Sequence, residues 1–392
     1  MSVNTMNFEQ AAALLNAVNA QVTGNTGITP TDTSGFVSLA TTTLQAGYDP
    51  VLNAISQIVG KTIFSIRPYS RKFAGLQVSN QRFGAITRKL NIADKDFESD
   101  VRFELVDGQS VDHYKVNKPE ILQTNFYGAN VFKKSYTIFR DQLDNAFTGP
   151  EQFGEFMSMV TSNASDMIEQ AHESLSRATV ANAIGGINAG ASAAPERIIH
   201  LLSEYNALTG LSLTATTVYQ PANFKAFMQF VYSRVAEISQ MMSERTSLYQ
   251  TKITGKNIVR HTPADRQKVY LYAPARYQFE MMAIADTYHD NYLKMADTET
   301  VNFWQSAQTK DQIKVTPNYL DANGAIVTGQ AQTISKVFGI MFDDEFMGYT
   351  VVNQWTATTP LNAEGGYWNV FHHFTDRYWT DYTEKAVVLL LD

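Results

Sequence analysis

The most regular hydrophobic pattern in the chain lies near its middle and predicts one long amphipathic helix over residues 153–184. Thr148 and Glu151 fit a capping box before it, Pro150 suits its first turn, and Gly185-Gly186 predicts its end. Roughly 35 residues at about 1.5 Å each would span about 50 Å. The positions that we expect to face the core repeat at helical spacing: Phe153, Phe156, Met157, Val160, Ile168 and Leu175.

The remaining patterns predict a mixed α+β chain. Residues 1–60 contain two short apolar runs separated by a loop, and they need a neighbouring surface to fold against. Alternation of apolar and polar residues predicts strands over 83–92, 101–108 and 121–139, a further strand over 268–272, and strands in the closing segment. Further helices are predicted over 198–208, after Pro221 and after Pro274.

Charge changes sign sharply inside the second segment, residues 61–120. Seven basic residues and no acid occur from Lys61 to Ala93, and seven acids against two bases follow from Asp94 to Asp112. This polar β segment has few apolar residues to bury locally. It is therefore either a solvated hairpin, or a surface whose basic and acidic halves meet opposite charges on another chain. The second interpretation selects these candidate contact residues: Arg82, Arg88, Lys89, Asp94, Asp96, Glu98 and Asp100.

Composition favours a buried partner surface. Charged residues make up only 18% of the chain, below the usual quarter, and Tyr and Phe number 19 and 23. The net charge of -7 disfavours sequence-specific nucleic-acid binding. The chain has no cysteine, which excludes disulfides, thiolate zinc sites and Cys nucleophiles. The opening residues lack the basic start of a signal peptide, and no uncharged apolar run reaches about 18 residues, so we expect a soluble, unexported protein with no membrane partner.

Catalytic motifs are missing from the sequence. GxSxG, GxxxxGK[ST], GxGxxG and HExxH do not occur. His372-His373 with Asp376 is the one local cluster of metal-ligand types, but adjacent residues of a strand point to opposite faces, so the two imidazoles do not share a metal. We therefore expect no catalytic residue, no cofactor and no metal, and a protein that is not an enzyme.

The order of these segments resembles the Hong Kong 97-like fold of tailed-bacteriophage major capsid proteins. The stretches MFDDEFMGYTVVNQWTATTP and YTEKAVVLLLD are similar to the closing strands of that family, and the long helix is similar to its spine helix. The resemblance implies this division of the chain: N-terminal arm 1–60, extended loop and flanking strands 61–120, peripheral domain with the spine helix 121–209, axial domain 210–340, and strands returning to the peripheral domain 341–392.

The resemblance also implies a function. The subunit would assemble with itself into hexamers and pentamers that form an icosahedral head shell around the viral DNA, without sequence-specific binding, in the host bacterial cytoplasm and then in the virion. Sustained heptads of a fused scaffold are missing, which implies either a separate scaffolding protein or none; portal and decoration proteins are further implied partners. Some relatives crosslink a loop Lys to an Asn, but no motif links Lys89 or Lys95 to one. The alternatives are an encapsulin-like cellular compartment, a phage tail or adaptor protein, or an enzyme whose site is built from scattered residues.

Overall fold

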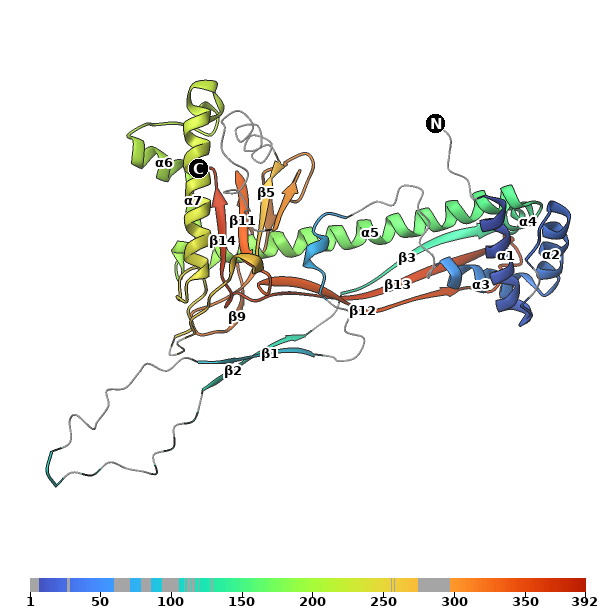
Figure 1. Ribbon diagram of the computed structural model, residues 1–392, viewed down its shortest axis with the longest axis horizontal. Coiled ribbons are helices and arrows are strands. Elements are labelled where there is room, and N and C mark those ends of the chain that lie inside the picture. Colours follow the sequence, from blue (N-terminus) through green and yellow to red (C-terminus); the bar gives the residue numbers. More distant parts are fainter. Residues whose placement is uncertain are drawn as a thin grey trace.

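One long helix connects two lobes at opposite ends of the molecule (Figure 1). This computed structural model describes residues 7–26, 29–59, 71–78, 86–93, 106–108, 110, 114, 116, 118, 120–127, 130–254, 256, 258–273 and 297–392. The helix is α5, Pro150–Ala189, which has 40 residues. We call the helical end, where α5 begins, the arm lobe, and the end where α5 finishes the sheet lobe.

The arm lobe is built from four short helices packed on the start of α5. They are α1 (Phe8–Thr23), α2 (Thr33–Gln45), α3 (Tyr48–Val59) and α4 (Arg140–Ala146). Phe36 of α2 packs edge-on against Phe153 of α5 at 5.9 Å between ring centroids, and the indole of Trp368 donates a hydrogen bond of 2.6 Å to Asp49. The surface on which the opening sixty residues fold is therefore part of their own chain.

Helix α5 begins and ends differently from the sequence prediction. Pro150 occupies the first turn as predicted, but the N-cap is Gly149 without a side-chain cap, so the predicted capping box of Thr148 and Glu151 is wrong. The helix also continues through Gly185-Gly186. A Cβ at Gly186 would collide with the ring of Tyr382, so this glycine permits a close approach rather than ending the helix.

The predicted apolar stripe of α5 is buried at its start and only half-buried further along. Phe153, Phe156, Met157 and Val160 belong to the arm-lobe core, with exposed fractions of 0%, 7%, 0% and 5%. Ile168 and Leu175 are half-buried, so the expectation of two core positions there is wrong. Apolar core contacts resume at Val180, because the helix between the two lobes is covered mainly on the side of a single sheet.

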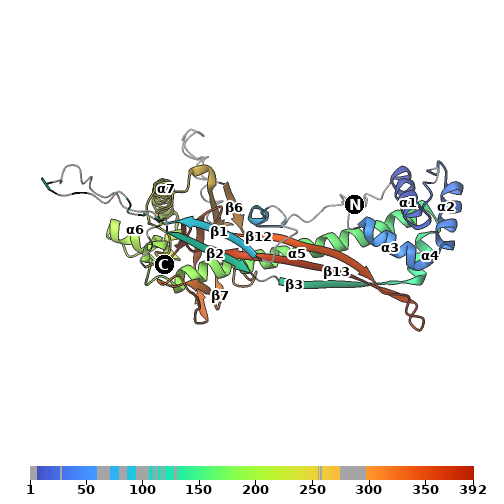
Figure 2. The same cartoon turned by 90° about the horizontal axis from the view of Figure 1, so that it is seen from below.

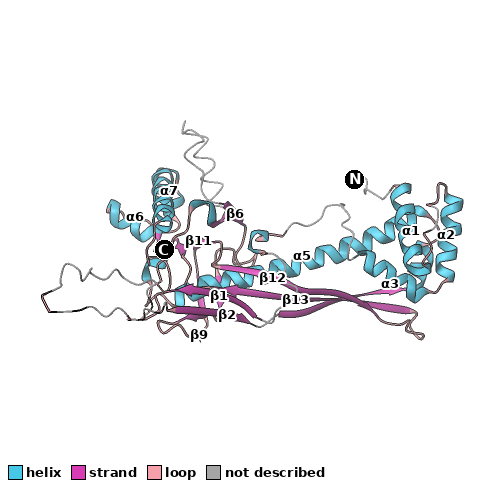
Figure 3. Cartoon of the chain, turned by 60° about the horizontal axis from the view of Figure 1, so that its bottom comes forward, coloured by secondary structure: helices cyan, strands magenta, loops and turns pink. Residues whose placement is uncertain are grey.

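A three-stranded antiparallel sheet runs along α5 (Figure 3). Its central strand is β13 (Tyr367–Thr380), flanked by β12 (Met347–Thr358) and β3 (Asn130–Phe139). Alternate residues of β13 are buried against α5 and its neighbours, as the period of two in a strand requires, and the opposite face is left open.

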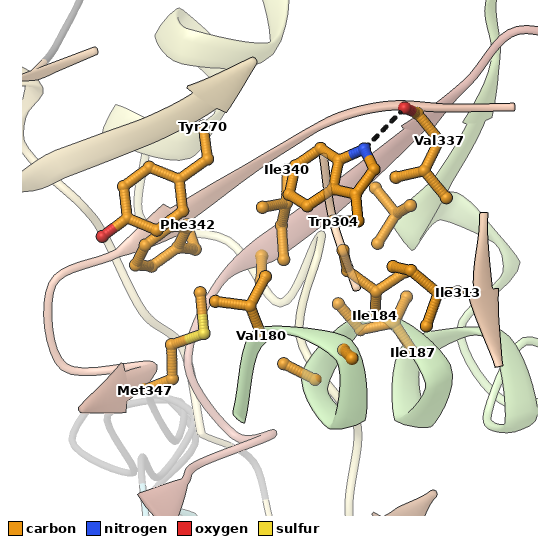
Figure 4. Close-up of a cluster of buried hydrophobic side chains, with 14 of the residues drawn as sticks. Val180, Ile184, Ile187, Tyr270, Trp304, Ile313, Val337, Ile340, Phe342 and Met347 are labelled. Atoms are coloured by element: carbon orange, nitrogen blue, oxygen red, sulfur yellow. Dashed lines mark hydrogen bonds between the residues drawn. The ribbon is translucent and has the colours of Figure 1, made fainter. Parts of the chain in front are cut away.

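The sheet lobe has helices on both faces of a five-stranded sheet. The strand order is β4 (Ile198–His200), β14 (Ala386–Leu390), β11 (Val337–Asp343), β5 (Gln267–Tyr272) and β6 (Asp297–Val301). On one face, α6 (Leu201–Thr209) and α7 (Pro221–Ser243) pack on Val387 and Leu389. On the other, Ile184 of α5 and Ile340 of β11 lie in one hydrophobic cluster (Figure 4). Val388 of β14 belongs to the same cluster. β14 is therefore apolar on both sides, which explains its uninterrupted run AVVLL.

Short elements complete the sheet lobe. They are the paired strands β7 (Ile313–Val315) and β10 (Gln332–Ile334), the hairpin of β8 (Asn318–Leu320) and β9 (Ile326–Thr328), and the 3-10 turns Ala74–Leu76, Pro195–Arg197, Thr217–Tyr219 and Ala264–Arg266. The indole of Trp304 donates to the carbonyl of Val337 at 2.8 Å and fixes the segment before β7 on β11 (Figure 4).

The strand prediction over 121–139 divides into two strands of different sheets. Its second half is β3, and its first half is β2 (Ile121–Tyr127), which pairs with β1 (Ile86–Ile92) to form a separate antiparallel ribbon. The predicted strand 101–108 lies mostly outside the described residues, as does the helix predicted after Pro274. Strand β1 thus pairs with a segment about 30 residues further on, a long-range contact that local alternation does not reveal.

The closing segment contributes to both sheets. Strands β12 and β13 lie along α5, whereas β14 lies at the centre of the five-stranded sheet beside β11. The predicted return of residues 341–392 to the long helix therefore describes β12 and β13 only. The predicted boundary between residues 340 and 341 also falls inside β11, which continues to Asp343.

Candidate interaction surfaces

The β1–β2 ribbon presents an apolar outer face to solvent. Leu90 and Ile92 of β1 are 65% and 66% exposed, and Ile121, the partner of Ile92 across the ribbon, is 60% exposed. Arg88 lies on the same face, because it is two residues from Leu90. Three neighbouring apolar side chains at this exposure form a patch of the kind that marks a contact with another molecule.

The inner face of the ribbon is anchored to the sheet lobe by Lys89. Its ammonium lies 3.0 Å from a carboxylate oxygen of Glu345 and 3.1 Å from one of Asp381, and it also contacts Glu384. Asp381 and Glu384 are almost fully buried, and Glu384 lies 3.2 Å from the guanidinium of Arg260. Lys89 was predicted to contact another chain; its charge is instead used within its own chain (Figure 2 shows the ribbon beside the sheet lobe).

Burial and neighbouring charges together determine the protonation of Lys89 and Glu384. Burial alone would lower the pKa of the Lys89 amine, but Asp381 and Glu384 more than offset it and the pKa is raised. Burial also raises the pKa of Glu384, against the opposing effect of Lys89 and Arg260. Because crosslinking by a lysine requires the neutral amine as nucleophile, an ammonium held by three carboxylates is a poor candidate for that chemistry.

Glu345 gives a pH-dependent test of this cluster. Burial acts to raise its pKa, but hydrogen bonds from Arg266 and Lys89 lower the pKa from 4.5 to about 2. A depressed folded-state pKa contributes stability that is present above the unfolded value and is lost as pH falls. We expect the stability difference between the parent and Glu345→Gln to shrink as pH falls from 4.5 to about 2, measured by urea denaturation. A difference that stays constant over that window would contradict the assignment.

The turn Asp381–Lys385 joins the ribbon anchor to three other elements. The hydroxyl of Tyr382 donates to the carbonyl of Asn318 at 2.7 Å, beside Gly186 of α5. The ammonium of Lys385 donates to the carbonyl of Glu244 at 2.6 Å and to that of Met242 at 3.1 Å, at the end of α7. Burial lowers the pKa of Lys385 to about 8. Carbonyl groups at a helix C-terminus favour a cation, so this turn fixes the end of α7 as well as the ribbon.

The open face of the three-stranded sheet is aromatic and free of acids. Its strands contain one acid, Asp376, which is fully buried on the other side. Trp355 is 49% exposed and stacks on His373 at 3.9 Å between ring centroids. Lys133 is exposed on the same face, with its ammonium 5.7 Å from the ring centre of Phe371. In a chain with 38 acidic residues, this face favours an anionic or neutral partner.

The predicted opposite orientation of the two adjacent histidines is confirmed. His372 is buried, and its ring lies 2.9 Å from the hydroxyl of Thr356, while His373 faces outward onto Trp355. Burial and His373 lower the pKa of His372. Asp376 instead pairs with His172 of α5 at 3.1 Å. Among the described residues no group of three His, Asp or Glu side chains is placed to hold a metal ion.

The pairing of His172 with Asp376 could not be read from the sequence. Both side chains are buried where α5 crosses β13, between the two apolar cores, and the ring of Tyr349 stacks on His172 at 5.7 Å. Burial raises the pKa of Tyr349 to about 12. The only local signal was a histidine within an otherwise apolar stripe.

Several predicted contact residues cannot be placed. Arg88 is exposed and Lys89 is anchored internally, but the others lie outside the described residues: Arg82, Asp94, Asp96, Glu98 and Asp100. In the part of the chain that the structure describes, no helix has the length and apolar character needed to cross a membrane.

Comparison with known proteins gives a match over almost the whole chain. The family model described as Phi29-like phage major capsid protein matches residues 13–390. The capsid structure of Staphylococcus phage Andhra is similar with a TM-score of 0.52 and 10% identity over 84% of this chain and 87% of that chain. The structure of head fiber and inner core protein gp22 of native bacteriophage P68 is similar with a TM-score of 0.49 and 11% identity, over 84% of this chain and 87% of that chain. No curated protein matches. At 10% identity the first of these structures shows a shared fold.

Proposed function

The chain belongs to the Phi29-like phage major capsid protein family, and from this premise we propose that its copies assemble as hexamers and pentamers into an icosahedral head shell. The family match over residues 13–390 is the observation that carries the proposal. The shell encloses the viral DNA without reading its sequence, since the net charge of -7 gives no general attraction to phosphate. Assembly takes place in the host cytoplasm, with a separate scaffolding protein, a portal and decoration proteins as further partners.

In this proposal the parts of the chain have distinct assembly roles. Residues 1–60 serve as the N-terminal arm, 61–120 as the extended loop and 121–209 as the peripheral domain with α5 as its spine. The axial domain begins at residue 210 and includes all of β11, to Asp343, together with β14. Strands β12 and β13 return to the peripheral domain. The lobes at the two ends of α5 support a subunit whose contacts are distributed along its length (Figure 1). The protein acts through repeated contact with copies of itself and has no catalytic role.

The extended loop acts between subunits. The exposed apolar face at Leu90, Ile92 and Ile121 gains stability when a neighbour covers it, at about 25 cal/mol for each Å² of apolar surface removed from water. The acidic half of the loop, from Asp94 to Asp112, meets the acid-free face of a neighbour's three-stranded sheet, where Lys133 is exposed. Charge complementarity of this kind selects the partner and its orientation more than it adds affinity.

Reversing Arg82 and the exposed Arg88 in the loop is expected to impair assembly while the subunit stays folded. The variant Arg82→Glu with Arg88→Glu leaves the Lys89 anchor in place. A single exposed ion pair contributes only about 0.2 to 1 kcal/mol, so two reversals in every subunit are more informative than one. We expect a clear loss of sedimenting shells with an unchanged circular dichroism spectrum.

The matched control for this reversal is Arg82→Lys with Arg88→Lys, which keeps both charges and should assemble like the parent. Normal shell yield from the double glutamate variant would show that these bases are only solvated. Raised salt should weaken assembly of the parent for the same reason.

A further inference from the structure

A groove of about 650 Å³ lies between the ribbon and the sheet lobe. One wall contains five consecutive residues of β2, from Leu122 to Phe126, and the opposite wall includes Leu175 of α5 and Ile326 of β9. Consecutive side chains of a strand point to opposite faces, so a wall that contains all five is formed by the edge of the strand and its main chain. The groove therefore presents backbone groups as well as side chains.

In the part of the chain that the structure describes, no strand lies beside that edge of β2. Among the described residues β2 pairs with β1 alone, through a register from Ile86 opposite Tyr127 to Ile92 opposite Ile121. On the second edge, the N–H and C=O groups of alternate residues face the groove and can receive another extended chain. At about 3.3 Å per residue, five residues provide an edge of about 16 Å.

The lining of the groove selects a neutral, partly apolar occupant. Its one charged lining residue among those described is Asp381, whose carboxylate is already paired with Lys89 at 3.1 Å. Leu122, Phe126 and Leu175 supply apolar surface inside, and Ile326 at the lip is 71% exposed. A charged segment would lose its hydration here without gaining a partner, whereas an uncharged one would not.

We propose that this groove binds an extended, uncharged segment of about five residues from a second copy of the chain, added to β2 as a third strand. The inference rests on the proposed function, because a shell places other copies of the chain beside every ribbon. The neutral lining does not fit the charged halves of the extended loop, but the chain also contains charge-free segments outside helices and strands; residues 211–216 are one. Main-chain hydrogen bonds supply the affinity, and the apolar side chains of Leu122, Phe126 and Leu175 select the segment.

Photocrosslinking from the groove wall tests the partner directly. The chain has no cysteine, so Thr124→Cys carries a single thiol for a benzophenone label. Labelled subunits diluted about twentyfold into unlabelled ones leave assembly to the parent chain. Irradiated shells are expected to give a covalent dimer that mass spectrometry maps to an uncharged segment, and unassembled subunits none. Shells whose label reacts only within its own chain, or only with a different protein, would overturn the proposal. Failure of the unlabelled parent to form shells would count against the proposed function instead.

A charge at the lip of the groove provides the second test. Ile326→Asp places a carboxylate on an exposed position, so folding should be unaffected while shell yield falls at least tenfold. Gln330→Asp adds the same charge to an exposed residue that does not line the groove, and it should assemble like the parent. Equal yields from the two variants, with intact circular dichroism, would contradict strand addition at β2.

Discussion

Replacing Phe153 with alanine is expected to lower the free energy of unfolding by about 3 to 5 kcal/mol, the range for a buried phenylalanine in a packed core. The ring is fully buried and contacts Phe36 and Phe147 edge-on, at 5.9 and 5.2 Å between centroids. Because α2, α5 and the segment after α4 all meet at this ring, its loss should loosen the arm lobe before assembly can take place. Urea denaturation of the unassembled subunit provides the measurement.

Leu175→Ala is the matched comparison on the same helix. Leu175 is half-buried at the wall of the groove, so its truncation should cost only about 1 kcal/mol. If both variants lose stability equally, the division of α5 into a buried start and a less covered middle is wrong.

Replacing Lys89 with methionine is expected to destabilise the subunit by about 3 kcal/mol. Removal of one partner from a buried charge cluster leaves the other charges without compensation, and here Asp381 would keep no salt-bridge partner among the described residues, while Glu384 would keep Arg260. The ribbon should also lose its orientation on the sheet lobe, so shells should form poorly even where the subunit folds. Denaturant midpoints and sedimentation together separate these two effects.

Arg88→Met is the control for Lys89→Met, because it removes a positive charge from the adjacent but exposed position. Its stability should stay within about 0.5 kcal/mol of the parent. A Lys89 variant as stable as the Arg88 variant would show that the internal anchor is weak. A charge reversal of the whole loop that includes Lys89 would mix folding with assembly and could not be interpreted.

Regular local patterns predicted two long helices and one buried strand. Helix α5 was predicted from its stripe, α7 from Pro221 and the apolar repeat that follows, and β5 from the short run KVYLY at residues 268–272. These elements depend on periodicity within one segment, which a single sequence displays. The predicted end of α5 at Gly185-Gly186 is wrong, although such a pair usually ends a helix. Gly186 instead makes room for the ring of Tyr382, which is nearly 200 residues further along the chain.

Contacts between distant segments could not be predicted. Lys89 is surrounded by Glu345, Asp381 and Glu384, more than 250 residues further along the chain, and nothing local distinguishes it from the exposed Arg88. The split of residues 121–139 into strands of two sheets has the same origin, since alternation predicts a strand but not its partner. The groove beside β2 likewise depends on where β9 and α5 lie.

Electron cryomicroscopy of the purified chain, residues 1–392, expressed alone and together with the proposed scaffolding protein, tests assembly most directly. Closed shells of hexamers and pentamers are expected, in which a neighbouring subunit covers the outer face at Leu90, Ile92 and Ile121. A protein that stays monomeric at high concentration under both conditions, or that forms only rings or tubes with this ribbon face open to solvent, would contradict this expectation.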